Sequence, residues 1–343
     1  MLGVLYVHYW GDTPITEHIR VTLFLVISGF LITHILMTAK SRGGALVARN
    51  FYLRRALRLF PALLITFAVA WGLDADDFRA SAAWHLLPTS NLYFATHETM
   101  KPWVVAHLWS LNLLEQFYLL WPVVILYLSE KTLHVMIVLG IAAMAFVQAN
   151  AAALGLDGWW LNFVFAFDPI LMGALACVLY RHRPLREVLT APMTVVLSLL
   201  VLASPLLIPQ FPAWANFGHS TSYRFFAQPA LAVLVMGAFQ GYGGPLGWLL
   251  QSPPARFLAQ ISYGVYVYHL LGWYVVGKFY PAIFAKGPFT FVVMTAVTVG
   301  LATGSWYFVE APIGRLKRYF PVRRAETGGA QTPSSAPVRP LPL

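Results

Sequence analysis

Residues 21–39 read VTLFLVISGFLITHILMTA, a run without Asp, Glu, Lys or Arg. A helix that crosses a bilayer needs about 20 consecutive, mostly apolar residues, so this run predicts a membrane helix. Similar apolar runs, separated by charged residues, proline and glycine, recur along the chain. On this pattern we expect ten helices, at about residues 1–11, 21–39, 59–73, 107–128, 134–155, 159–180, 192–209, 224–242, 257–279 and 288–309.

The composition excludes an ordinary soluble protein. Of the 343 residues, 59% are apolar and only 10% are charged, whereas soluble domains carry about 25% charged residues. We therefore expect an all-α integral membrane protein, a bundle of about ten transmembrane helices. Residues 1–318 form one membrane domain, and residues 319–343 form a basic, then Gly-, Ser- and Pro-rich tail that we expect to be disordered.

The formal charge of +10 does not indicate a nucleic-acid partner, because the basic residues cluster between the apolar runs. If the segment after the second helix is cytoplasmic, seventeen of the 23 Lys and Arg residues lie inside, and six lie outside: Arg20, Arg79, Lys101, Arg224, Lys278 and Lys286. This asymmetry follows the positive-inside rule. It predicts a multi-pass membrane protein with both termini in the cytoplasm.

Ionisable residues inside the predicted spans are candidates for function, because a charge in hydrocarbon is costly. They are His8, Glu115, Asp168, His269 and, at a span boundary, Glu310. His8 has an alternative interpretation as an interfacial residue among Tyr6, Tyr9 and Trp10. Asp168 precedes Pro169, which can open the helix locally; the carboxylate is either functional or the cap of the next helix.

Two helical stripes carry polar side chains. In HLWSLNLLEQFYLLWP (107–122), Asn112, Glu115 and Gln116 share one face; the alternative to a catalytic role is hydrogen bonding between helices. In ISYGVYVYHL (261–270), Ser262, Tyr266 and His269 also share a face.

The segment RNFYLRRALRLFP (49–61) places Arg54, Arg55 and Arg58 close together if the third helix starts early. Guanidinium groups suit a phosphorylated ligand. The alternative is that these arginines set topology and contact the phosphates of membrane lipid.

Several known chemistries are absent from the sequence. There is no GxxxxGK[ST] loop, HExxH motif or GxSxG elbow. Cys177 is the single cysteine, so neither an intramolecular disulfide nor a multi-cysteine metal site can form. We expect no bound metal.

Seven segments in order resemble the acyltransferase-3 family of bacterial membrane proteins. They are the segment around His8, FLVISGFLIT (24–33), FYLRRALRLFPA (51–62), HLWSLNLLEQFYLLWP (107–122), FDPILMGALA (167–176), ISYGVYVYHL (261–270) and YFVEAPIGRLKR (307–318). The resemblance implies ten spans and an enzyme of the bacterial inner membrane. This enzyme would move an acyl group, acetyl being expected, from cytoplasmic acyl-CoA to a hydroxyl of a carbohydrate or another envelope molecule. Acyl-CoA would be a co-substrate, with no tightly bound cofactor.

The resemblance also implies site residues. His8 matches the family's essential histidine and Ser28 lies in its SGF segment, while Arg54, Arg55 and Arg58 match arginines that could hold the phosphates of CoA. Two positions depart from the family pattern. Leu114 stands where the family usually has Glu, beside Glu115, and the arginine that usually lies eleven positions before His8 would precede Met1. Together with the short first apolar run, this leads us to expect that the natural protein begins upstream.

The predicted chemistry needs a base and donors for an oxyanion. A histidine such as His8 can remove the proton of a sugar hydroxyl, and Ser28, Tyr266 or a backbone N–H beside Gly29 can stabilise the tetrahedral intermediate. A covalent acyl-histidine or acyl-serine is the alternative. Glu115 and His269 complete the candidate catalytic residues. The competing function is a transporter or flippase for a glycan or lipid-linked substrate.

Overall fold

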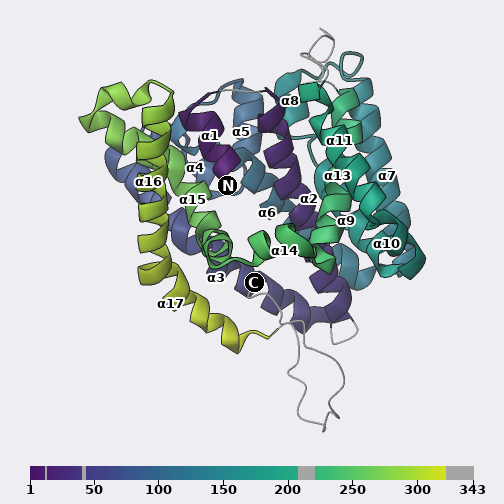
Figure 1. Ribbon diagram of the computed structural model, residues 1–343. Helices are drawn as coiled ribbons and strands as arrows, with labels where there is room; N and C mark the ends of the chain where they lie inside the picture. The colour runs from purple at the N-terminus through teal and green to yellow at the C-terminus, as the bar shows by residue number, and fades with distance from the viewer. Residues whose placement is uncertain (12–13, 41–43, 208–220, 322–343) are drawn as a thin grey trace.

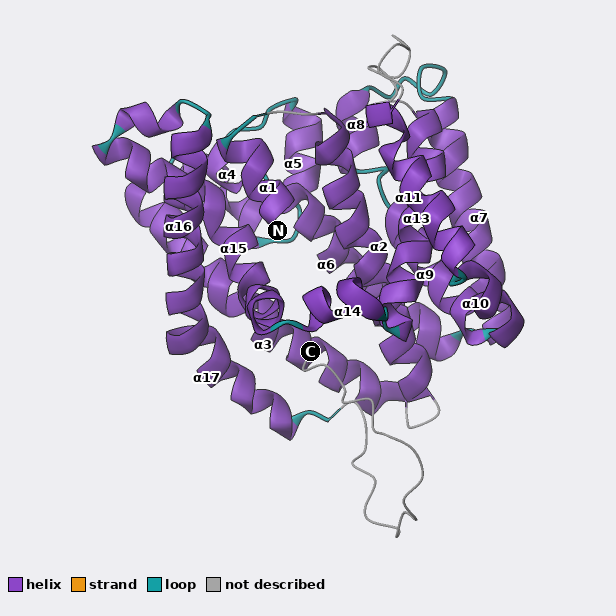
Figure 2. Ribbon diagram, in the orientation of Figure 1, coloured by secondary structure: helices purple, strands orange, loops and turns teal. Residues whose placement is uncertain are grey.

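The structure is a computed structural model that describes residues 1–11, 14–40, 44–207 and 221–321. Within these ranges all regular structure is helical and no strand occurs (Figure 2). The predicted all-α class is confirmed. The predicted tail begins inside the described part, where Tyr319 ends the last helical turn and residues 320 and 321 follow it. The rest of the tail lies outside the described residues.

Long helices account for most of the chain. They are α2 (Pro14–Ala39), α3 (Gly44–Leu73), α6 (Leu108–Tyr127), α7 (Glu130–Ala149), α9 (Asp168–Arg181), α11 (Pro192–Leu207), α13 (Thr221–Gln240), α15 (Pro253–Phe279) and α16 (Pro288–Ser305). Shorter helices fill the connections: α1 (Leu2–Tyr9), α4 (Phe78–Leu86), α5 (Ser90–His97), α8 (Gly158–Phe163), α10 (Arg183–Leu189), α14 (Gly244–Gln251) and α17 (Ala311–Gly314). A π-helical turn, Trp306–Glu310, joins α16 to α17, and the 3₁₀ turn η6 (Arg315–Tyr319) follows.

The predicted count of ten spans is not confirmed. By length and composition, six helical segments of the described chain can cross a membrane, or up to eight if two bent helix pairs each count as one span. The α1 and α15 helices, which we expected to span, are outside this set. The α1 helix has only 8 residues. The α15 helix carries Ser, Tyr and His side chains because it packs in the interior of the bundle, where thirteen of its residues are buried.

Two predicted helices differ from those in the structure. The third helix begins at Gly44, well before the expected residue 59, so the arginine segment is helical rather than a loop. The predicted helix over 159–180 is interrupted between α8 and α9, immediately before Asp168 and Pro169. This break agrees with the expected effect of Pro169, which cannot donate a backbone hydrogen bond.

Exposure separates central from peripheral helices. The membrane-length window is 61% buried in α6 but only 11% buried in α7. The exposed residues of α7 include Val138, Leu139 and Phe146, which is the apolar surface that contact with lipid requires. In Figure 1, α7, α10 and α11 lie along one side of the bundle, while α16 and α17 follow the opposite edge.

Helices α2 and α9 cross in close contact through two glycines. A Cβ on Gly29 would lie 2.0 Å from the Ile170 carbonyl oxygen, and one on Gly173 would lie 2.1 Å from that of Val26. Small residues allow helix backbones to approach in this way in membranes. The SGF segment therefore fixes the position of α2 against α9.

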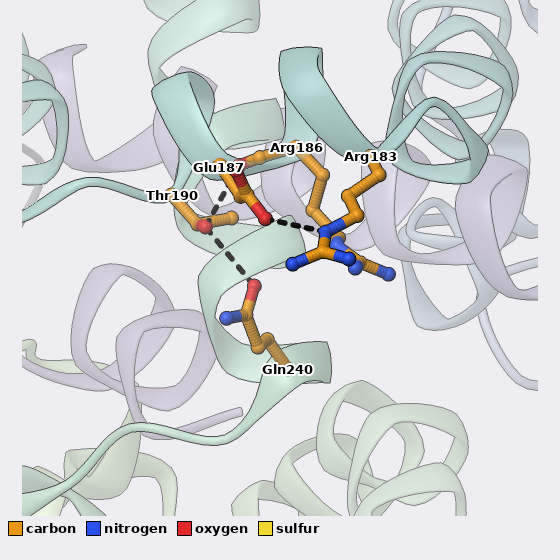
Figure 3. Close-up of polar contacts among 5 residues, drawn as sticks. All are labelled: Arg183, Arg186, Glu187, Thr190 and Gln240. Carbon is orange, nitrogen blue, oxygen red and sulfur yellow. Dashed lines mark hydrogen bonds and ion pairs between the residues drawn. The ribbon is translucent and has the colours of Figure 1, made fainter.

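Polar contacts tie a short peripheral helix to its neighbour. At the end of α10, the Thr190 hydroxyl donates to Oε1 of Gln240 in α13 at 3.0 Å (Figure 3). Arg183 Nε donates to Oε1 of Glu187 one turn further along α10, at 2.8 Å. These exposed contacts position α10 and lie apart from the candidate site.

Candidate active site

The short helix α1 is fixed by its backbone. The Val4 carbonyl accepts from Arg20 Nη1 at 3.4 Å, the Val7 carbonyl from Lys286 Nζ at 3.3 Å, and the Tyr9 carbonyl from the Gly287 N–H at 2.9 Å. The last carbonyls of a helix lack partners within the helix, and Lys286 and Gly287 supply them here. The α1 helix is thereby held against the start of α16.

Three histidines meet next to α1, and we call them the histidine group: His8, His107 and His269. The ring centroid of His269 lies 4.9 Å from that of His8 and 4.7 Å from that of His107. His269 and His107 are buried, and His8 is half-buried. His8 thus faces the bundle interior, rather than the interfacial position considered above, whereas Tyr6 and Trp10 stack on each other beside Phe291.

Hydrogen bonds define the protonation of His269. Its Nδ1 lies 2.6 Å from the carbonyl oxygen of Tyr266. A carbonyl oxygen only accepts, so Nδ1 carries the proton, and Nε2 of the neutral ring is an acceptor. Within the described chain this Nε2 is buried without a hydrogen-bond partner. The Tyr9 hydroxyl donates to the His269 carbonyl at 2.7 Å and so connects α1 to the same turn of α15.

Tyr266 lies against the histidine group, but Ser262 does not. The Tyr266 hydroxyl donates to the His107 carbonyl and is 2.8 Å from Ser110 Oγ. Its ring centroid is 5.0 Å from that of His107. Ser262 instead donates to the Ala259 carbonyl of its own helix at 2.8 Å.

The polar stripe on α6 is mainly a contact between helices. Asn112 Oδ1 accepts from the Ser90 N–H at 2.7 Å, and Gln116 Nε2 donates to Asn91 Oδ1 at 2.9 Å, so both side chains hold α5. Glu115 Oε2 accepts from Asn112 Nδ2 at 2.7 Å. Leu114, which stands where the family pattern has Glu, is fully buried in the apolar core and offers no carboxylate there.

Ser28 and Gly29 differ in what they can contribute. Ser28 is buried in α2, one turn after Phe24, whose ring stacks on Tyr266 at 6.0 Å. Gly29 lies in the middle of α2, where a backbone N–H donates to the carbonyl four residues before it. The N–H at Gly29 is therefore unavailable as an oxyanion donor, which corrects that alternative.

The arginine cluster (Arg54, Arg55 and Arg58) lies on α3. Arg54 Nη1 donates to the carbonyls of Lys317 at 2.9 Å and Phe320 at 3.5 Å. The Arg55 guanidinium lies over the rings of Phe51 and Tyr118, at 5.5 Å and 5.2 Å from their centroids. Arg54 and Arg58 share a helix face as i, i+4 neighbours, and Arg55, next to Arg54, interacts electrostatically with both.

Helix α15 connects the arginine cluster to the histidine group. The Tyr263 hydroxyl donates to the carbonyl of Leu59, the residue after Arg58, at 3.0 Å. His269 follows Tyr263 by six residues, which is about 9 Å along a helix axis. Helix α15 therefore contacts the arginine segment at Tyr263 and the histidine group at His269, at two successive positions along its axis.

Asp168 does not cap α9, which corrects that alternative. It is the first residue of α9, and the cap position is Phe167, which makes no side-chain capping bond. The buried carboxylate accepts from Gln148 Nε2 of α7 at 3.2 Å and from Gln228 Nε2 of α13. Asp168 therefore joins three helices away from the histidine group.

Comparison with known proteins identifies the family. The family model described as an acyltransferase domain, that of the acyltransferase-3 family, matches residues 1–307. The chain belongs to the acyltransferase-3 family. It is 26% identical over 320 residues to peptidoglycan O-acetyltransferase OatA of Listeria monocytogenes, covering 86% of this chain and 51% of that protein. It is 23% identical over 347 residues to O-acetyltransferase OatA of Staphylococcus aureus, covering 91% and 55%. No solved structure matches.

The chain thus spans about half the length of the curated relatives it matches. Membership of the acyltransferase-3 family favours an acyltransferase over the transporter or flippase alternative. Together with the membrane-length apolar helices, it identifies a multi-pass membrane protein.

Sequence reasoning missed His107 as a site residue. The expected helix over 107–128 began at this residue, so His107 stood at a span boundary and not among the ionisable residues inside a span; in the structure it precedes α6. His107 meets His269 because the 3₁₀ turn η2 (Trp103–Val105), just before it, packs on α15. Among the described residues, no group of three or more His, Cys, Asp or Glu side chains is arranged to hold a metal ion.

Proposed function

We propose that this acyltransferase-3 protein is a membrane O-acyltransferase that transfers an acyl group, acetyl being expected, from acyl-CoA to a hydroxyl of a carbohydrate. The observation that carries the proposal is the histidine group, in which a buried acceptor nitrogen, Nε2 of His269, lies beside His8 at the interior face of α1. The OatA relatives support the acceptor class, because one is named for peptidoglycan, a carbohydrate polymer with free hydroxyls.

In this reaction the acceptor oxygen forms a C–O bond to the acyl carbon and the C–S bond of the thioester breaks. His8 takes the hydroxyl proton as the oxygen attacks, and the proton passes to the departing thiolate, which leaves as CoA. The neighbouring His269 ring can stabilise the protonated state of His8 through its acceptor nitrogen. Ser28 and Tyr266 carry the hydroxyl groups that we expect to donate to the oxyanion. Tyr266 does so by turning its hydroxyl away from the His107 carbonyl, to which it donates in the structure.

Acyl-CoA is the proposed donor because its phosphate end and its thioester end suit the two groups that α15 connects, the arginine cluster and the histidine group. The phosphates of CoA are separated from the thioester by the pantetheine arm, so the two ends of the donor must bind at different places. The arginine cluster beside Leu59 offers guanidinium groups for the phosphates, and the histidine group near His269 offers a base for the thioester end.

The direct test is release of CoA by purified protein. With acetyl-CoA and soluble peptidoglycan fragments, we expect free thiol to appear together with an acetyl mass increment on the fragment. Without fragments, thiol release should stay near the background of spontaneous hydrolysis. Thiol release that is independent of the acceptor, or acetylation that needs no CoA ester, would contradict the proposal.

We further propose that both termini face the cytoplasm of a bacterial inner membrane, as the distribution of basic residues predicts. A reporter fused after Leu343 should be active only if it is of the cytoplasmic type, and one inserted between Gly155 and Gly158 should be active only if it is periplasmic. The second fusion controls for expression. A periplasmic signal from the C-terminal fusion would reverse the orientation.

A further inference from the structure

A fourth cation lies next to the arginine cluster. Lys317 belongs to η6, and its carbonyl accepts from Arg54 Nη1 at 2.9 Å. Its side chain interacts electrostatically with Arg54, Arg55 and Arg58. The turn η6 thus packs against α3 and adds a positive charge to the arginine cluster. The spacing of these residues in the sequence does not indicate this contact.

One carboxylate accompanies these four cations. Glu310, at the end of the π-helical turn, is buried, accepts from Ser305 Oγ at 2.9 Å and interacts electrostatically with Arg58 and Lys317. It is held close to α15, since a Cβ on Gly264 would lie 3.2 Å from its Oε1. Among the described residues, however, no ion pair within 4 Å joins Glu310 to any of the four cations. The group therefore keeps a net positive charge.

Arg54 has a different role from its neighbours. Its guanidinium is directed to the carbonyls of Lys317 and Phe320, while Asn50 of the preceding turn donates to the Pro321 carbonyl at 2.9 Å. These bonds attach the segment 315–321 to α3. Arg54 is thus a positioning residue for Lys317.

We propose that Lys317 joins Arg55 and Arg58 as a further ligand of a pyrophosphate-type anion at the arginine cluster, with Arg54 holding Lys317 in place and Glu310 limiting the affinity. Like charges gathered at one place repel each other, and an anion with several oxygens relieves the repulsion while accepting charge-assisted hydrogen bonds. Lysine supplies a point charge on a flexible stem, and arginine a planar pair of donors. The assignment of this anion as the phosphates of CoA rests on the proposed function.

The experiment measures binding of CoA and, separately, of inorganic pyrophosphate to the purified full chain. Lys317→Gln should weaken both by about tenfold or more, the effect of losing one hydrogen bond to a charged group, and Lys317→Arg should restore most of the affinity. Glu310→Gln should bind both anions more tightly. Arg315→Gln is the matched control, because it removes one positive charge from an exposed position of the same turn, and it should leave both affinities within about twofold.

Arg54→Gln distinguishes positioning from direct contact. If Arg54 acts through Lys317, the double variant Arg54→Gln/Lys317→Gln should bind no more weakly than Lys317→Gln alone. An additive loss would make Arg54 a direct ligand and overturn its positioning role.

The outcomes separate this site from the proposed function. If Lys317→Gln binds both anions as tightly as Arg315→Gln does, the site is wrong even when acyl transfer is observed. If the parental chain binds pyrophosphate in a Lys317-dependent manner but does not bind CoA, the anion site stands and the proposed donor is wrong. Binding of neither anion to the parental chain overturns the site.

Discussion

Replacement of His8 by alanine is expected to lower acetyl transfer at least about 100-fold, the smaller end of the loss caused by removing a general base. The His8 ring lies 4.9 Å from His269 and is half-buried at the interior face of α1. The fold should survive, because α1 is held by its backbone carbonyls and by Tyr9 rather than by His8. The measurement is thiol release from acetyl-CoA in the presence of peptidoglycan fragments.

His97→Ala is the matched control for this experiment. His97 is exposed on α5, where its ring stacks on Tyr93 at 4.3 Å, and it has no contact with the histidine group. Its replacement should leave the rate unchanged.

Intact-mass measurement after incubation with acetyl-CoA alone separates general-base catalysis from covalent catalysis through an acyl-histidine or acyl-serine, because only covalent catalysis leaves an acetyl group on the protein. A folded His8→Ala variant with the parental rate would exclude His8 from the reaction.

Replacement of Gly29 by alanine should prevent stable assembly of the bundle. The new Cβ would lie 2.0 Å from the Ile170 carbonyl oxygen and 2.9 Å from its carbon, both backbone atoms that cannot move unless α2 and α9 separate. Overpacking costs about 1–3 kcal/mol where side chains can adjust, and here the cost should reach or exceed about 3 kcal/mol. The expected result is a large fall in the thermal midpoint of the detergent-solubilised protein.

Gly300→Ala provides the comparison. It makes the same chemical change in α16, where nothing lies within 4 Å of the added Cβ. Alanine is the better helix former, so the midpoint should stay constant or rise. Gly173→Ala should repeat the loss seen at Gly29, since its Cβ would lie 2.1 Å from the Val26 carbonyl oxygen. Equal midpoints for Gly29→Ala and Gly300→Ala would show that the crossing of α2 and α9 is less tight than described.

The sequence by itself determined the fold class and the location of most helices. An uncharged apolar run such as residues 21–39 has one stable form in lipid, a helix, because no water is present to satisfy its backbone groups. The same reasoning marked His8 and His269, since an ionisable group in such a run is costly. The arginines were marked instead by their close spacing in a basic segment. Pro169 likewise indicated from local chemistry that the helix expected over 159–180 can open there, and the structure has its break at this point.

Only the tertiary structure decided which of these groups meet. His8 and His269 lie in α1 and α15, and His107 immediately precedes α6. Their contact depends on how these three parts of the chain pack, which the period of one helix does not encode. The same holds for Lys317, which reaches Arg54 across a separation of 263 residues. Conversely, helical periodicity correctly placed Ser262 on the same face as His269, but in the folded bundle the Ser262 hydroxyl donates to the Ala259 carbonyl of its own helix. Helical periodicity determines a face, whereas a site also requires the neighbouring helix that covers it.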